Sequence, residues 1–67
     1  MNKSYVLLCL YEAFKCGREI SIENCCKEYG ISTPTFRRYI STLRAFFWER
    51  ERKEIIYDVE NKIYKLK

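Results

Sequence analysis

The chain has 67 residues, a formal net charge of +4 at pH 7, 48% hydrophobic residues and 16% aromatic residues. Disordered segments contain fewer apolar and aromatic residues, so we expect one small folded domain that buries roughly 60% of the surface of its unfolded chain. A domain of this size has little room for a catalytic cleft. Because the chain also lacks histidine, a glycine-rich phosphate loop and paired carboxylates in a predicted pocket, we expect no enzymatic activity, no cofactor and no small-molecule ligand.

Neither a membrane span nor an export signal is evident. The longest apolar run, residues 6–11, is far shorter than the roughly 20 residues needed to cross a bilayer, and it lies within a helical pattern. We therefore expect a cytoplasmic protein without membrane contact.

The chain contains four cysteines, Cys9, Cys16, Cys25 and Cys26. They form no C-x-x-C pair, two are adjacent and histidine is lacking, so the spacing favours neither a zinc site nor a disulfide framework. Free cysteine commonly packs as a small hydrophobic residue, so we expect reduced, mostly buried thiols and no metal. A redox or thiol-reactive switch and a metal site are the alternatives.

The positive charge is concentrated in the second half of the chain. Residues 1–32 contain four basic and four acidic residues, whereas residues 33–67 contain nine basic and five acidic residues. One basic face on an otherwise neutral domain is the electrostatic pattern expected of a nucleic-acid-binding protein.

The first predicted helix begins after Ser4, a plausible N-cap, and continues to about Lys15 with apolar residues at helical spacing. Gly17 ends it. The helix is apolar around more than half of its circumference, with Leu8 extending the apolar stripe. It is therefore covered by the rest of the domain, or one side of it faces a second chain.

Residues 18–20 are too short for a helix, and we expect a short strand there. Ser21 is a suitable N-cap for a second, brief helix, and Gly30 supplies the left-handed conformation that ends it. Only Ile31 and Ser32 separate this end from the next helix. Two helices joined by a short glycine-containing turn form the outline of a helix-turn-helix. The expected buried face of the second helix consists of Ile22, Cys25, Cys26 and Tyr29.

The third helix is capped by Ser32 or Thr33, has Pro34 in its first turn and continues to about Arg50. Its apolar stripe should pack on the first two helices. From Thr33 to Arg44 the helix has three arginines and no acid, so its exposed side is positive. The stripe consists of Phe36, Ile40, Leu43 and Phe47, and the opposite face carries Pro34, Arg38, Ser41 and Ala45.

The end of the chain changes to a β-type pattern. Residues 49–54 alternate in charge and are interpreted as a solvated helix end and loop without a site. Residues 55–66 then predict an antiparallel hairpin with its turn at Glu60-Asn61, which must dock on the helices to be stable. The predicted cross-strand pairs are Ile55 with Leu66, Tyr57 with Tyr64 and Val59 with Lys62, and the face toward the helices consists of Ile55, Tyr57, Tyr64 and Leu66.

This order of elements resembles the winged helix-turn-helix domains at the N-terminus of DeoR- and WYL-class bacterial transcription regulators. The resemblance implies a mainly α fold with a small β-hairpin: three helices, a short strand after the first and a two-stranded wing. It covers nearly the whole chain. The matching residues are Ile20-Ser21, Tyr29-Gly30-Ile31-Ser32, Thr35-Phe36-Arg37-Arg38 with Ile40 and Leu43, and Ile55, Tyr57-Asp58 and Tyr64-Lys65-Leu66 in the wing.

The chain also departs from this family. Tyr39 stands where an aspartate is usual and Ile63 where a glycine is usual, and the stretch from Leu43 to Ile55 is several residues longer. The longer stretch suggests an added surface. The ligand-sensing domain that usually follows is absent from these residues, so no metabolite sensing is expected. By the resemblance, Cys25 and Cys26 are core positions of the second helix, and a large residue at Cys26 should destabilise the domain by about 1 to 3 kcal/mol.

In a DNA-binding module of this kind, the third helix lies in the major groove and the basic hairpin contacts the flanking backbone. Arg38 is the candidate for bidentate contact with guanine, while Arg37 and Arg44 hold phosphates. Simple solvation of Arg37 and Arg44, with Arg44 over Trp48 as a cation–π pair, is the alternative. The candidate DNA-contacting residues are Thr33, Thr35, Arg37, Arg38, Ser41, Arg44, Lys62 and Lys65.

A single module of this size binds DNA weakly, so we expect a homodimer that places two such helices about 34 Å apart. The candidate interface residues are Leu8, Tyr39, Phe46 and Trp48, although core packing is the other interpretation of Phe46. A protein–protein adaptor is the competing function, since small winged-helix domains also dock on proteins. A phage or mobile-element regulator, such as an excisionase-like or antirepressor protein, combines both possibilities.

Overall fold

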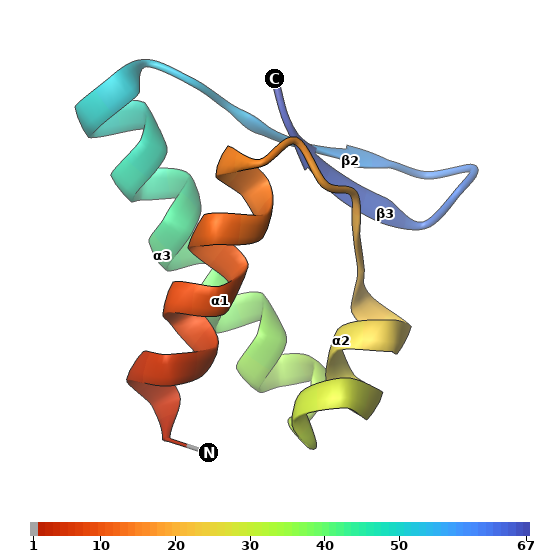
Figure 1. The fold of residues 1–67 in the computed structure, drawn as a ribbon. Coiled ribbons are helices and arrows are strands. Elements are labelled where there is room, and N and C mark those ends of the chain that lie inside the picture. Colours follow the sequence, from red (N-terminus) through yellow and green to blue (C-terminus); the bar gives the residue numbers. More distant parts are fainter. Residues whose placement is uncertain (1) are drawn as a thin grey trace.

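The computed structural model describes residues 2–67, apart from the side chain of Lys3. In this part of the chain, three helices and three short strands form a mainly helical domain with a small antiparallel sheet (Figure 1). The predicted order of helices, short strand and hairpin is therefore confirmed. The elements are α1 (Lys3–Lys15), β1 (Ile20–Ser21), α2 (Ile22–Tyr29), α3 (Thr33–Glu51), β2 (Ile55–Asp58) and β3 (Ile63–Leu66).

Side chains cap the start of each helix. Ser21 Oγ accepts a hydrogen bond from Asn24 N at 3.3 Å, and Ser32 Oγ accepts one from Thr35 N at 3.3 Å, as predicted for α2 and α3. The predicted cap of α1 was wrong. Asn2 is its N-cap, with Oδ1 accepting from Tyr5 N at 2.8 Å, so that Ser4 lies inside the first turn.

Residues in the left-handed backbone conformation lie at or just after the C-terminal ends of the three helices. Gly17 (φ 79°) follows α1, and Gly30 (φ 64°) is the C-cap of α2, in a conformation that glycine adopts without steric cost. Arg52 (φ 54°) is the C-cap of α3, which ends at Glu51, one residue beyond the predicted end near Arg50. The turn between α2 and α3 is thus limited to residues 30–32.

The strands form one sheet in the order β1-β3-β2. Ile55 pairs with Leu66 and Tyr57 with Tyr64, as predicted, and β1 adds to the free edge of β3. The predicted pair between Val59 and Lys62 was wrong, because the β2–β3 ladder ends at the pair Asp58 with Ile63. Residues 59–62 form a four-residue turn instead.

The Asp58 carboxylate organises this turn. It accepts hydrogen bonds from Glu60 N at 3.0 Å, Asn61 N at 3.2 Å and Asn61 Nδ2 at 2.9 Å. These bonds, first of all the one from the Asn61 side chain, lower the pKa of Asp58 below its ordinary value. Lys62 then takes a left-handed φ of 55°, which returns the chain to β3 without a glycine.

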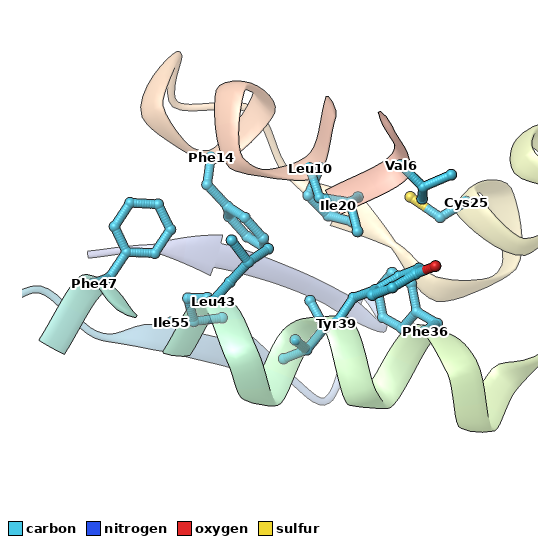
Figure 2. Packing of buried hydrophobic residues seen from close by; sticks show 11 residues of the cluster. Val6, Leu10, Phe14, Ile20, Cys25, Phe36, Tyr39, Leu43, Phe47 and Ile55 are labelled. Atoms are coloured by element: carbon cyan, nitrogen blue, oxygen red, sulfur yellow. The ribbon is translucent and has the colours of Figure 1, made fainter. Parts of the chain in front are cut away.

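One face of α3 is buried in the hydrophobic core. The predicted stripe is confirmed, because Phe36 and Phe47 are 0% exposed and Ile40 and Leu43 are 3% exposed. Figure 2 shows side chains of α3 directed toward those of α1, with Ile20, Cys25 and Ile55 completing the cluster. The α1 residues of the core are Val6, Leu10 and Phe14.

Two tyrosines lie differently from the prediction. Tyr39 is only 9% exposed and belongs to the core, so its assignment to an exposed interface was wrong. Tyr57 was expected to face the helices but is 46% exposed. Its ring lies 4.7 Å from that of Tyr64, which in turn lies 5.6 Å from that of Phe36. The two hairpin tyrosines therefore form successive layers over the start of α3.

All four cysteines are free thiols, but the expectation that most are buried was wrong. Only Cys25 is buried, and its burial raises its pKa to about 11. Cys26 and Cys9 are half-buried and Cys16 is exposed. Within residues 2–67, no three histidine, cysteine, aspartate or glutamate side chains are grouped as ligands for a metal ion. No described helix combines the length and apolar composition needed to cross a bilayer.

The aromatic contacts of Phe47 generate a stability prediction. Its ring stacks on Tyr11 at 5.4 Å and meets Phe14 edge-on at 6.3 Å. Replacing Phe47 with alanine should lower the free energy of unfolding by about 3–5 kcal/mol, since it removes buried surface and leaves a cavity between α1 and α3. Urea unfolding followed by circular dichroism measures the change.

Phe46→Ala is the matched control, because Phe46 is 39% exposed and has only edge contacts with Tyr11 and Phe47. It should cost about 1 kcal/mol. Equal losses for the two variants would contradict the proposed packing.

The Asp58 turn generates a pH prediction. A carboxylate whose folded-state pKa is depressed stabilises the fold above its unfolded pKa, and this contribution is lost as pH falls through the lower folded value. The backbone and side-chain amide signals of Asn61 should therefore titrate below the ordinary Asp58 pKa of 3.8 in an NMR experiment. Asp58→Asn, which has no ionisable group, should remove this titration. A titration midpoint above 3.8 would contradict the stabilisation of the ionised Asp58 carboxylate by its three hydrogen bonds.

Candidate nucleic-acid interface

The turn before α3 fixes the position of the helix start. Ile31 N donates to Cys26 O at 3.1 Å, and the half-buried Ile31 side chain packs against the core. Ser32 then caps α3, and Phe36, one turn further, is fully buried. The first turns of α3 are therefore held against the domain from one side, while the other side faces solvent.

The solvent side of α3 carries the predicted arginines. Arg37, Arg38 and Ser41 are exposed, as is Thr33 in the first turn. Among the described side chains, ion pairs join only Lys15 and Lys53 to Glu51, at 2.6 and 3.7 Å. The charges of Arg37 and Arg38 are therefore not neutralised by a partner within this part of the protein.

Thr35 differs from the other predicted contacts. It is half-buried, and its Oγ1 accepts a hydrogen bond from the Ser32 hydroxyl at 3.0 Å. Its hydroxyl thus belongs to the cap of α3, whereas the exposed Thr33 has no such bond among the described contacts.

Arg44 connects α3 to the hairpin. Its Nη2 donates to Ile55 O at 3.2 Å, which uses one of the five guanidinium N–H groups and leaves the others available. Arg44 is not the cation over Trp48, as the alternative interpretation had it. Arg52 occupies that position, with Cζ 5.2 Å from the ring centroid.

The two predicted hairpin lysines lie on a separate element. Lys62 is exposed in the turn and Lys65 is exposed on β3, opposite Ile56. In Figure 1 the turn between β2 and β3 extends away from the helices. The fold thus brings Thr33, Arg37, Arg38 and Ser41 together along one helix, and it presents Lys62 and Lys65 on a separate, projecting hairpin.

The remaining interface candidates lie on two different surfaces. Leu8 is 64% exposed and Phe46 39% exposed, and both line a groove of about 220 Å³ between α1 and α3. Trp48 is 47% exposed but lies outside this groove, near the end of α3. The groove is otherwise lined by Leu7, Tyr11, Thr42 and Leu43.

Sequence reasoning missed two hollows. One, of about 430 Å³, lies between α1 and α2 and includes Glu12, Arg18 and Tyr29. Burial, followed by the nearby Glu28 charge, raises the pKa of Tyr29 to about 12. The other, of about 310 Å³, lies beside Trp48 and includes Glu54, from the segment to which no site was assigned. The exposed tryptophan next to that charged segment was the available signal.

Comparison with known proteins leaves the interface to be interpreted from its own geometry. No family model matches the chain, and neither a curated protein nor a solved structure matches it significantly.

Proposed function

We propose that this chain is a winged helix-turn-helix domain that binds double-stranded DNA sequence-specifically and acts as a small transcription regulator. The observation that carries the proposal is the arrangement of α3. Its buried stripe faces the domain, while Arg37 and Arg38 face solvent without ion-pair partners among the described residues. The three-residue turn from α2 supports a helix-turn-helix interpretation.

The dimensions of α3 suit a major groove. Its 19 residues correspond to a length of about 28 Å, and the groove is about 12 Å wide. The N-terminal half of α3 therefore enters the groove. Arg38 donates two hydrogen bonds to a guanine edge, and Ser41 lies on the same face. Thr33 and Arg37 contact phosphates, and Thr35 acts by positioning the first turn.

The hairpin acts as the wing in this proposal. Lys62 and Lys65 are exposed and contact phosphates of the flanking backbone. Asp58 contributes indirectly, because its three hydrogen bonds hold the turn that carries Lys62. The order of elements, with its docked hairpin, also supports the resemblance to the DeoR and WYL class of regulators.

Pairing of two copies belongs to the same proposal. The described chain measures 30 × 29 × 20 Å along its principal axes, which is compatible with two copies in contact that hold equivalent helices about 34 Å apart, the separation of successive major grooves. The apolar groove with Leu8 and Phe46 is the surface we assign to this contact. Trp48 lies elsewhere, and Tyr39 is buried, so neither takes part in it.

A protein-binding adaptor, including an antirepressor or excisionase-like module, is the second candidate. The observation that favours it is the same groove, whose exposed lining is entirely apolar. An apolar groove rimmed by polar surface suits a partner's hydrophobic side chains. The arginines of α3 have no role in that function, which separates it experimentally from DNA binding.

Removal of Arg38 should reduce base discrimination. Selection from a random DNA pool identifies the preferred site, and binding is then measured for that site and for single-base variants. Arg38→Ala should lose about 1–3 kcal/mol of discrimination at one guanine position, because the bidentate contact is gone.

Arg37→Ala is the matched variant on the adjacent residue. It should weaken binding to all sequences similarly and lower the slope of log affinity against log salt by about one. A lack of binding to any duplex at low salt would favour the adaptor function instead.

Disruption of the apolar groove should produce a monomer. Leu8→Glu places a charge in the proposed contact, so a dimer observed by sedimentation at high micromolar concentration should dissociate. Val59→Glu is the control, since Val59 is 74% exposed but lies in the hairpin turn. A wild-type protein that sediments as a monomer with and without DNA would contradict the dimer.

A further inference from the structure

Trp48 is a large exposed aromatic residue whose surroundings differ from those of the other exposed aromatics. It lies in the last turns of α3, with Arg44 four residues before it and Arg52 four residues after it. The Arg52 guanidinium covers one face of the indole ring at 5.2 Å. Since Trp48 is nevertheless 47% exposed, the ring retains surface for a second flat partner.

A hollow lies beside this ring. Its volume is about 310 Å³, at the lower end of the range for small-ligand sites, and Arg52 is not among the residues that line it. It is therefore distinct from the side on which the Arg52 guanidinium rests. The lining residues are Arg44, Trp48, Lys53, Glu54 and Ile55.

Backbone and side-chain hydrogen bonds fix the walls of this hollow. Arg44 Nη2 donates to Ile55 O at 3.2 Å, and Lys53 N donates to Phe47 O at 3.3 Å. Glu54 O accepts from Lys67 N at 2.8 Å. These groups are held before any ligand arrives, which reduces the entropy lost on binding.

The charges around Trp48 favour an anionic strand. A second hollow next to the ring, of about 270 Å³, is lined by Trp48, Arg52, Glu54 and Lys67. Together the two hollows beside Trp48 are lined by four basic residues, and Glu54 is the only acid among their lining residues; the basic residues are Arg44, Arg52, Lys53 and Lys67. The positive charge of Lys53 is partly compensated by Glu51, whose Oε1 lies 3.7 Å from Lys53 Nζ. Because the C-terminal end of a helix carries partial negative charge, these side chains must supply the attraction for phosphate.

We propose that the exposed face of Trp48 stacks on an unpaired nucleobase, with Arg44 on its phosphate and Glu54 accepting from a base amino group. Aromatic side chains next to basic residues are the general means by which proteins bind single-stranded nucleic acid. A carboxylate accepts from the exocyclic amino group of cytosine, whereas thymine has a carbonyl oxygen at that position and offers only its ring N3–H. The site should therefore prefer cytosine over thymine.

The position of Trp48 along α3 agrees with this use. The approach of the strand rests on the proposed function, in which the start of α3 occupies a major groove. Trp48 follows Arg38 by ten positions, or about 15 Å, which exceeds the about 12 Å width of the groove. Trp48 therefore lies beyond the paired bases that Arg38 contacts, where an extruded base or a single-stranded extension is within reach.

The test uses intrinsic fluorescence, because Trp48 is the only tryptophan. The probes are a blunt duplex, the same duplex with a single-stranded cytosine or thymine extension, and a single strand. The extension should quench Trp48 fluorescence and strengthen binding, and Trp48→Ala should weaken binding of the extended duplex by about 5- to 150-fold. Binding of the blunt duplex, followed by anisotropy, should remain unchanged.

Three variants complete the design. Trp48→Phe should retain part of the extended-duplex affinity, since it keeps an aromatic face. Tyr5→Ala removes an exposed aromatic side chain of α1 that lies outside both this hollow and the apolar groove, and it should leave all affinities unchanged. Glu54→Ala should abolish the preference for cytosine extensions without preventing stacking.

The outcomes separate this inference from the proposed function. Equal affinity for blunt and extended duplexes, with unchanged fluorescence, overturns the inference while duplex binding stands. Quenching by single strands without any duplex binding supports the Trp48 site and removes the major-groove function. Quenching of Trp48 fluorescence in the wild-type protein, together with an unchanged affinity of Trp48→Ala for the extended duplex, overturns stacking as a source of binding energy.

Discussion

The burial of one face of α3 is the constraint on which the rest of the domain depends. Phe36 and Phe47, almost at opposite ends of the helix, are both fully buried, and α1 supplies Phe14 and Leu10 between them. A helix anchored at both ends cannot rotate to hide its arginines. The hydrophobic core therefore determines which side of α3 is exposed, and the basic surface follows from packing without any buried polar residue among those described.

The basic surface has two parts with different physical characters. Around Arg37 and Arg38 the side chains are exposed and without partners within the described chain, so they can adapt to a ligand. Around Trp48 the groups are held by backbone contacts, a cation–π interaction and the Arg44 bond to Ile55 O. The part around Arg37 and Arg38 suits a ligand with a long, regular surface. The part around Trp48 suits a single planar group of a ligand.

Much of the fold was predictable because local signals agreed. Ser21, Gly30 and Ser32 delimit α2 and α3 through capping, and alternation in the hairpin sets its register. The burial of Tyr39 was not predictable from a narrow stripe, because α2 also packs on α3 and widens the arc that faces the core. Arg44 and Arg52 are both four residues from Trp48, so spacing alone could not identify which of them covers the ring. In the structure Arg44 donates to Ile55 O, and Arg52, at the left-handed end of α3, lies over the ring.

The tyrosines of the hairpin link the outer surface of the domain to its interior. Tyr57 rests on Tyr64, and Tyr64 rests on Phe36, the residue directly before Arg37. Protein interiors are densely packed and contain few voids, so they transmit strain from one side chain to the next. A displacement of the hairpin is therefore transmitted through the rings of Tyr57, Tyr64 and Phe36 to the first turns of α3. The orientation of α3 is thus coupled to the orientation of the hairpin.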